Sequence, residues 1–244
     1  MNILLFGGTT EGRLLSEKLL ERGHAVTVCV ATGYGEEEQA QVNGATVLTG
    51  RKDAAEMADL MAGRDLCVDA THPYATEATK SIRSAAAQTG TRYVRVKRDL
   101  SEDGTTDKDG VRFFETSADA AAYLQTTDGN ILLATGVKEL PDFAGLPPER
   151  LFPRILPTVE NLQACEALGI PHRNIIAMQG PFTKELNAAL LRQNQIARFV
   201  TKDGGTTGGF PEKREAALEA GVELLVLTPP DDEGVSIETL LKTL

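Results

Sequence analysis

The stretch Gly7-Gly8-Thr9-Thr10-Glu11-Gly12-Arg13 combines residue types that together can bind an anion. It follows an uninterrupted apolar run that begins at Ile3, and it precedes a helical pattern with Leu15 and Leu19 on one face. A buried strand, a glycine turn and a helix start direct backbone N–H groups and the positive end of the helix dipole toward the turn. We therefore expect a nucleotide or another anion to bind there.

The glycine spacing is close to the dinucleotide-binding pattern G-x-G-x-x-G, with one departure. Gly7 and Gly12 occupy the outer glycine positions, whereas Thr9 occupies the middle one, where glycine lets the pyrophosphate approach the backbone. Either the phosphates bind in a different position or Gly8 supplies the room. Arg13 favours a binding site over a turn whose glycines only relieve crowding, because a cation in the first helical turn opposes the dipole unless an anion lies nearby.

A second stretch, Asp69-Ala70-Thr71-His72-Pro73-Tyr74-Ala75, directly follows a predicted strand. Pro73 suits the first position of a helix and forces His72 into an extended conformation. In a dinucleotide fold this strand flanks the first one where the strand order reverses, beside the nicotinamide end of the cofactor. We expect His72 to contact the ligand, and histidine is the side chain that titrates near neutral pH. The alternative is a solvated loop histidine or a helix cap.

Two shorter stretches also follow predicted strands. Thr135-Gly136 with Lys138 opens one turn, and Met178-Gln179-Gly180-Pro181-Phe182 opens another. Phe182 either offers a flat face to a conjugated ligand or packs in the core, and we weigh these two possibilities equally.

Within the stretch from Val200 to Lys213, residues 204–209 are four glycines and two threonines, and they precede a helix with proline at its start. It predicts a second loop for a phosphate or a carboxylate, with charge from Lys202 and Lys213. A merely flexible loop is the alternative. The remaining basic candidates near strand ends, unless they are only solvated, are Arg95, Arg98 and Arg154.

Strand and helix patterns alternate along almost the whole chain, which predicts parallel sheets with right-handed crossovers. Further predicted strands span residues 25–30, 45–48, 66–70, 93–96, 111–114, 131–134, 151–156, 174–178, 196–201 and 222–227. Predicted helices include residues 53–61, 117–124, 159–168, 184–193 and 211–220. We predict an α/β protein of two Rossmann-like domains with a ligand cleft between them. Residues 1–97 would bind the dinucleotide and residues 98–244 would complete the substrate site, with a linker at 99–110.

The formal net charge of −10 argues against non-specific nucleic-acid binding, so an anionic substrate has to meet a local cluster of Arg and Lys. Cys29, Cys67 and Cys165 have no C-x-x-C spacing and are typical of buried structural thiols, and we predict no metal site. No apolar run approaches the ~20 residues of a membrane span. The first strand begins without a charged leader region, so we expect a cytoplasmic protein.

The motifs at 7–13, 69–75 and 180–182, followed by Thr201-Lys202-Asp203 through Lys213, resemble the precorrin-6A reductase family over nearly the whole chain. The resemblance implies two Rossmann-like domains. It also implies that a reduced nicotinamide reduces one carbon–carbon double bond of precorrin-6A, giving precorrin-6B on the way to cobalamin. The hydride would reach a ring carbon conjugated with an imine-like nitrogen. The acetate and propionate arms of the macrocycle explain the need for Arg and Lys in an acidic protein.

The resemblance implies that residues 71–74, and Lys202 with its glycine loop, line the cleft. We predict catalytic roles for His72 and Lys202, with His72 as the general acid because histidine titrates near neutral pH, although solvent or the macrocycle's own nitrogens could supply the proton. The expected cofactor contacts are Gly7, Gly8, Thr9, Thr10, Gly12, Arg13, Thr32, Thr71 and Pro73. The expected substrate contacts are Tyr74, Arg95, Gly136, Lys138, Arg154, Gly180, Phe182, Lys202, Asp203, Gly205 and Lys213. This chain departs from the family at Gly204, where Ser is frequent, and at Thr228-Pro229, where Arg-Pro is frequent.

The segment from Val30 to Glu38 bears on which nicotinamide is used. Sites for NAD place an acidic residue near the ribose here, whereas sites for NADP have an arginine nearby. The segment holds three glutamates and no basic residue before Arg51, and its Ala-Thr-x-Tyr-Gly pattern resembles the cobalt-precorrin branch of the family. We expect NADH to serve at least as well as NADPH, and a cobalt-containing macrocycle. The alternative is a solvated acidic loop, with Arg51 or the second domain reading a 2′-phosphate.

Two other functions stay open at this point. A non-catalytic dinucleotide-binding sensor would have no use for Lys202 and the loop that follows it. A tetrapyrrole-modifying lyase or synthase would need no nicotinamide. The sequence does not indicate the oligomeric state.

Overall fold

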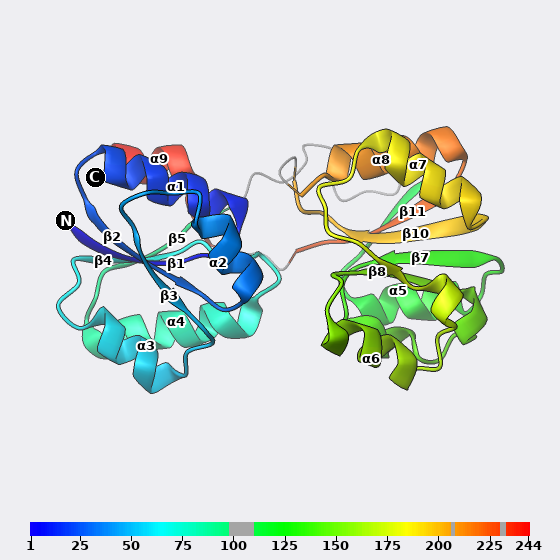
Figure 1. Cartoon of the computed structure of the whole chain (residues 1–244), viewed down its shortest axis with the longest axis horizontal. Helices are drawn as coiled ribbons and strands as arrows, with labels where there is room; N and C mark the ends of the chain where they lie inside the picture. The colour runs from blue at the N-terminus through cyan, green and yellow to red at the C-terminus, as the bar shows by residue number, and fades with distance from the viewer. Residues whose placement is uncertain (98–109, 206–207, 230–232) are drawn as a thin grey trace. The chain divides into compact units, whose positions relative to one another are not determined.

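The apolar runs of the chain form the strands of two parallel sheets in the computed structural model, which describes residues 1–97, 110–205, 208–229 and 233–244 (Figure 1). The sheets belong to two compact units, one of Met1–Asp99 with Pro230–Leu244 and the other of Leu100–Pro229. The predicted α/β class with two Rossmann-like domains is therefore confirmed.

The sheet of the first unit has the strand order β3-β2-β1-β4-β5, and every pair is parallel. Its strands are β1 Asn2–Phe6, β2 Ala25–Val30, β3 Thr46–Thr49, β4 Leu66–Asp69 and β5 Tyr93–Arg95. The order reverses between β1 and β4, so the loops after these two strands flank the crevice where such folds bind ligands.

Helices cover both faces of this sheet, with α1 and α9 on one face and α3 and α4 on the other (Figure 1). The helices are α1 Thr10–Glu21, α2 Gly33–Gln39, α3 Ala54–Met61, α4 Thr76–Thr89 and α9 Ile237–Lys242. Leu15 and Leu19 of α1 are fully buried against β1, as their spacing predicts. Met57 and Met61 of α3 pack on the opposite face.

The end of the chain returns to the first unit. Val235 forms a parallel bridge with Val96, and its N–H donates to the Arg95 carbonyl at 2.9 Å. Leu240 and Leu241 of α9 are buried in the same core as Leu15 and Leu19. The predicted C-terminal domain of residues 98–244 is therefore wrong after residue 229, because the apolar face of α9 completes the first core. Residues 99–109 of the predicted linker, and the candidate Arg98, lie outside the described residues.

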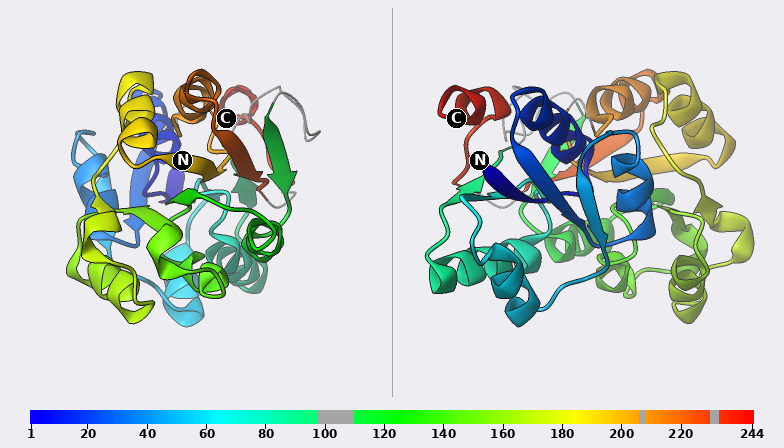
Figure 2. Two further views of the ribbon diagram at one scale, coloured as in Figure 1. Left: turned by 90° about the vertical axis from the view of Figure 1, so that its right-hand side faces the viewer. Right: turned by 60° about the vertical axis from the view of Figure 1, so that its left-hand side comes forward.

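The sheet of the second unit has the strand order β6-β11-β10-β7-β8-β9, again parallel throughout. Its strands are β6 Val111–Phe114, β7 Asn130–Ala134, β8 Leu151–Ile155, β9 Ile176–Ala177, β10 Ile196–Lys202 and β11 Glu223–Leu227. Its helices are α5 Ser117–Leu124, α6 Val159–Ala167, α7 Lys184–Gln193 and α8 Phe210–Ala220, with 3₁₀ turns η1 Leu140–Phe143, η2 Pro148–Arg150 and η3 His172–Asn174. Figures 1 and 2 show α7 and α8 on one face of the sheet, and α5 and α6 on the other. The strand order reverses between β7 and β10.

Two local features differ from the sequence-based expectations. The segment after β2, expected to be a loop, contains helix α2, which Thr32 caps by accepting the Gly35 N–H at 3.2 Å. Pro73 is not at the first position of a helix, because α4 begins only at Thr76. Instead, Pro73 lies in a turn closed by a 2.8 Å bond from the Ala75 N–H to the His72 carbonyl.

Candidate functional site

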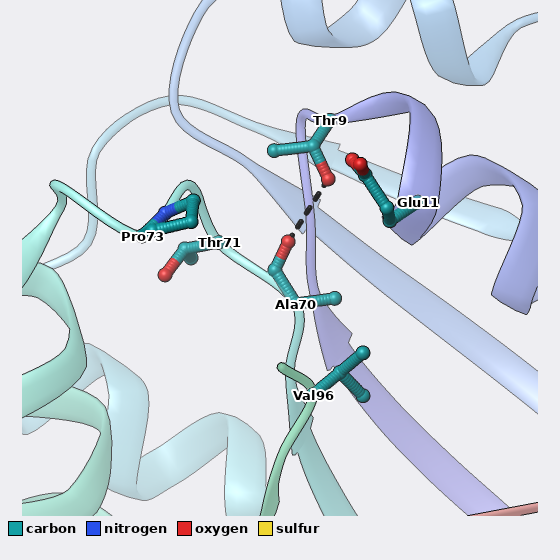
Figure 3. Close-up of a pocket in the computed structure, with 6 residues that line it drawn as sticks. All are labelled: Thr9, Glu11, Ala70, Thr71, Pro73 and Val96. Carbon is teal, nitrogen blue, oxygen red and sulfur yellow. Dashed lines mark hydrogen bonds between the residues drawn. The ribbon is translucent and has the colours of Figure 1, made fainter. Parts of the chain in front are cut away.

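The glycine turn connects β1 to α1 and is tied to the neighbouring strands by hydrogen bonds. The Gly7 N–H donates to the Cys29 carbonyl of β2 at 2.9 Å. Thr9 caps α1 by accepting the Gly12 N–H at 3.1 Å, and its hydroxyl donates to the Ala70 carbonyl at 3.0 Å (Figure 3). The last bond joins the turn after β1 to the loop after β4, across the point where the strand order reverses.

The packing of the turn explains why its glycines are needed. A Cβ on Gly12 would lie 3.2 Å from the Gly7 Cα, and a Cβ on Gly35 would lie 3.1 Å from the Gly8 Cα. Gly8 itself has a φ of +92°, which L side chains rarely adopt. Backbone thus packs on backbone at the start of α1, where the helix dipole favours an anion, so the residues present fit a dinucleotide phosphate. The sequence pattern did not indicate a packing role for Gly35, because it lies in helix α2, which was not predicted.

A small pocket lies beside this turn and is shown in Figure 3. It is lined by Thr9, Glu11, Ala70, Thr71, Pro73 and Val96. Thr9, Thr71 and Pro73 are predicted cofactor contacts, and the structure brings these three together. Glu11 and Ala70 stand inside the motifs that the sequence highlights, whereas nothing in the sequence distinguishes Val96 from a core residue.

The Arg13 side chain of α1 forms an ion pair with a carboxylate of the protein. Its Nε lies 2.9 Å from Oε1 of Glu38 on α2, and the two side chains are 20% and 17% exposed. The sequence predicts an anion near Arg13, and the structure places the Glu38 carboxylate there. Thr32, a predicted cofactor contact, has its hydroxyl engaged in capping α2.

A buried ion pair stands behind the loop after β4. The Asp69 Oδ1 accepts from Arg95 at 2.7 Å, from the Thr71 hydroxyl at 2.7 Å and from the Thr71 N–H at 3.0 Å. The Arg95 and Asp69 side chains are 2% and 0% exposed, and the Tyr93 hydroxyl donates to the other Asp69 oxygen at 3.2 Å. Arg95, a predicted substrate contact, thus lies in the interior, where it holds Thr71 in the pocket wall together with Asp69. The pKa of the Tyr93 hydroxyl is raised, mainly by burial and next by the charge of Asp69.

His72 lies on the exposed side of this loop. Its Nδ1 accepts the Tyr74 N–H at 3.3 Å, and the two rings lie 5.6 Å apart between centroids. When the ring is neutral, this bond leaves the proton on Nε2. The Tyr74 N–H therefore fixes one ring nitrogen of this exposed side chain.

The second unit gathers several predicted substrate contacts at its own point of strand-order reversal. Lys202 ends β10, and its Nζ lies 2.7 Å from the Glu139 Oε1 in the turn after β7. The two side chains are 17% and 21% exposed. The same turn carries Gly136, with a φ of +87°, and the exposed Lys138. Glu139, whose carboxylate holds the Lys202 ammonium in place, was not among the predicted site residues.

The glycine loop after β10 is compact. The Asp203 Oδ1 accepts the Gly205 N–H at 2.9 Å, and the Lys213 Nζ donates to the Gly208 carbonyl at 2.9 Å. A Cβ on Gly208 would lie only 2.6 Å from the Gly204 carbonyl oxygen, so this loop depends on glycine. The predicted residues Asp203, Gly205 and Lys213 are thus brought together, while Thr206 and Thr207 fall outside the described part of the chain.

Arg154 occupies the carboxyl end of β8 and is 6% exposed. Its guanidinium carbon lies 4.1 Å from the Phe182 ring centroid and 5.6 Å from that of Phe199, and Nη1 donates to the Asn187 Oδ1 at 2.7 Å. Burial lowers the pKa of Arg154 to about 10. The Phe182 ring in turn covers Gly180, where a Cβ would lie 3.0 Å from it. Phe182 and Arg154 therefore form one stacked group, which neither alternative for Phe182 anticipated.

The cysteines take no part in these groups. All three are free and buried, and burial raises the pKa of Cys29 to about 11 and that of Cys67 to about 12. Both thiols are therefore protonated at neutral pH, as expected of structural cysteines. Within the described ranges, no three His, Cys, Asp or Glu side chains are grouped so that they could hold a metal ion. No helix among the described residues is long and apolar enough to cross a membrane.

Comparison with known proteins gives consistent matches over the whole chain. A family model described as precorrin-6x reductase CbiJ/CobK matches residues 2–244. The cobalt-precorrin-6A reductase of Priestia megaterium is 37% identical over 239 residues, covering 95% of this chain and 91% of that protein. The enzyme of the same name from Methanothermobacter thermautotrophicus is 36% identical over 237 residues, covering 95% of this chain and 77% of that protein.

A solved structure described as CobK precorrin-6A reductase superimposes on the chain with a TM-score of 0.78. The match covers 100% of this chain and 96% of that one, at 23% sequence identity. At this level of identity the likeness supports the fold.

Proposed function

We infer the function of this chain from the family to which it belongs, the precorrin-6x reductases CbiJ/CobK. The protein is a reductase of cobalamin biosynthesis that acts on precorrin-6A or its cobalt form. A nicotinamide cofactor, when bound, supplies the hydride that reduces one carbon–carbon double bond of the macrocycle. The main structural support for this function is the glycine turn at the start of α1, with the pocket beside it.

We assign the cofactor to the first unit. Gly7, Gly8 and Gly12 would let the pyrophosphate approach the backbone at the start of α1. The nicotinamide end would lie against Thr71 and Pro73, where the small pocket separates the turn from the loop after β4. The Asp69–Arg95 pair holds Thr71 from behind, so this wall is fixed before the cofactor binds.

We assign the carboxylate arms of the macrocycle to basic groups of the second unit. Lys202, Lys138 and Lys213 all follow or flank the strands at which the order reverses. Because Lys202 is held by Glu139, a substrate carboxylate would join an existing pair and form a charge-assisted bond. Arg154 with Phe182 offers a buried cation and an aromatic face near the end of β8.

We further propose that NADH serves at least as well as NADPH, that the natural macrocycle carries cobalt, and that the reaction takes place in the cytoplasm. Acidic residues follow β2 where a ribose is read, and the relatives from Priestia megaterium and Methanothermobacter thermautotrophicus are named cobalt-precorrin-6A reductases.

The proposed function is tested by anaerobic incubation of the protein with cobalt-precorrin-6A and either nicotinamide, followed in the visible spectrum. We expect the macrocycle spectrum to change only when a reduced nicotinamide is present, with NADH oxidised in equal amount. A spectral change without nicotinamide would indicate a lyase or synthase. Nicotinamide binding without any change would indicate a sensor. A tenfold preference for NADPH, about 1.4 kcal/mol in transition-state binding, would contradict the NADH proposal.

Replacing Lys202 by Ala is expected to raise the apparent substrate constant about tenfold or more. Losing a charge-assisted contact costs about 1.5–3 kcal/mol, and the substitution also leaves the Glu139 carboxylate beside the substrate arms. The dependence of substrate binding on ionic strength should decrease, because one cation no longer takes part. The measurement is steady-state kinetics at several salt concentrations. Lys80→Ala, which removes a lysine of an exposed pair in the first unit, is the control. If Lys202→Ala matches this control, the loop is only structural.

Replacing His72 by Asn tests whether His72 is the general acid. Asparagine retains an acceptor for the Tyr74 N–H but cannot deliver a titrating proton. We expect the wild-type rate to fall as the pH rises and the imidazolium is lost, and this fall to disappear in the variant. The measurement is the pH dependence of kcat, with His172→Asn, which changes another exposed histidine, as the control. An unchanged pH profile would exclude His72 as the proton donor.

A further inference from the structure

The Arg13–Glu38 pair leaves part of the arginine unused. Only Nε of Arg13 contacts Glu38, at 2.9 Å, and the terminal nitrogens have no partner among the residues that the structure describes. A guanidinium normally binds a carboxylate or a phosphate through its planar fork of N–H donors. At one-fifth exposure, Arg13 can still offer the rest of this fork to a ligand in the cofactor site.

Glu38 is held in place by its neighbour in the sequence. The side-chain amide of Gln39 donates to the Ser16 hydroxyl at 2.8 Å, and that hydroxyl donates to the Arg13 carbonyl at 2.7 Å. Gln39 and Ser16 are 1% and 0% exposed. Helix α2 is therefore fixed against α1 directly beside the pair, so the Glu38 carboxylate is a permanent part of this surface.

The location of the pair indicates which part of a dinucleotide it faces. Side chains at the end of β2 and just beyond it read the 2′ position of the adenosine ribose. Helix α2 follows β2, and Gly35 near its start lies so close to the glycine turn that an added Cβ would be 3.1 Å from the Gly8 Cα. Glu36 and Glu37 are exposed on the same helix, so Glu38 is the glutamate of this segment that is engaged with a cation.

We propose that Glu38 sets the choice between NADH and NADPH by neutralising Arg13, an inference that rests on the proposed function. A 2′-phosphate carries close to two negative charges and meets a pair with no net charge, together with the acidic surface of α2. A 2′-hydroxyl carries no charge and avoids this repulsion. Without the charge of Glu38, Arg13 becomes an uncompensated cation next to the ribose, and the phosphate becomes the favoured group.

The test is the Glu38→Gln variant, studied by titration calorimetry with NAD⁺ and NADP⁺, without any macrocycle. Glutamine retains an oxygen that can accept from the Arg13 Nε, so the geometry is preserved while the charge is removed. We expect NADP⁺ to bind the Glu38→Gln variant at least tenfold more tightly than it binds the wild type. The affinity for NAD⁺ should change by less than about threefold. Glu37→Gln changes the net charge equally but at an exposed position, where solvent screens the charge, so it should change either affinity by less than about threefold.

The double variant Arg13→Gln with Glu38→Gln shows whether the gain passes through Arg13. We expect the gain for NADP⁺ to be lost. A gain that persists in the double variant, or an equal gain in Glu37→Gln, would overturn the inference. If wild-type protein binds both nucleotides and Glu38→Gln leaves their ratio unchanged, the inference fails while the proposed function stands. If wild-type protein binds neither nucleotide, both fail.

Discussion

The Asp69→Asn variant is expected to lose about 3–5 kcal/mol of unfolding free energy, the largest effect on stability predicted for a single substitution in this chain. Asp69 and Arg95 are almost fully enclosed, and removing the carboxylate charge leaves the guanidinium buried without its counter-ion. Breaking such a pair costs more than the pair contributes, because the desolvation of the remaining charge is no longer offset. The measurement is urea denaturation followed by circular dichroism.

Two comparisons separate this effect from a general loss of charge. Glu77→Gln removes a carboxylate from an exposed pair with Lys80 on α4, and it should change stability by less than about 0.5 kcal/mol. Adding Arg95→Met to Asp69→Asn removes the buried cation as well and should restore part of the loss. Equal stability of Asp69→Asn and wild type would show that the pair does not support the first unit. A double variant less stable than Asp69→Asn would assign the cost to packing.

Substitution of Gly12 is expected to have the largest effect on cofactor binding. A Cβ at this position would lie 3.2 Å from the Gly7 Cα and 3.5 Å from the Thr9 Oγ1, so it presses on both the turn and its cap. Gly12→Val adds two further methyl groups, and overpacking of this kind costs about 1–3 kcal/mol. If that cost falls on the binding geometry, the affinity for NAD⁺ decreases about 10- to 100-fold in calorimetry.

Gly12→Ala should give a smaller decrease and keeps the prediction testable if the valine variant does not fold. Gly33→Ala is the matched control, because a Cβ on Gly33 meets nothing within 4 Å and its φ is not in the left-handed region. That variant should bind NAD⁺ as wild type does, with stability unchanged or higher by about 0.4–1 kcal/mol. Normal affinity of a folded Gly12→Val protein would place the phosphates elsewhere.

Most elements of the fold follow from patterns within the chain. The strand at Ala25–Val30 and the helices at Ser117–Leu124 and Lys184–Gln193 were predicted with the bounds that the structure shows. Periodicity identifies such elements because their cores are apolar and their ends carry caps or glycines. Helix α2 escaped prediction because two of its first three residues are Gly33 and Gly35, which disfavour helix, and its packing against the turn overrides that propensity.

The partners of the predicted site residues could not be predicted in the same way. Arg13 and Glu38, Asp69 and Arg95, and Glu139 and Lys202 are each more than twenty residues apart in the chain. The sequence identifies the cations as candidates because they follow strands, but which of them meets a carboxylate depends on how helices and loops pack. Arg95 is an example. Its position at a strand end predicted a ligand contact, but its side chain is enclosed and paired with Asp69.

The return of residues 233–244 to the first unit has a consequence for biosynthesis of the protein. A ribosome makes these residues only after the whole of the second unit, so the nascent first unit waits with the apolar surface that α9 covers still open to water. The second unit is continuous in sequence and has all of its strands earlier. The first unit is therefore begun first but completed last, and a chaperone would meet it as the last part of the chain to mature.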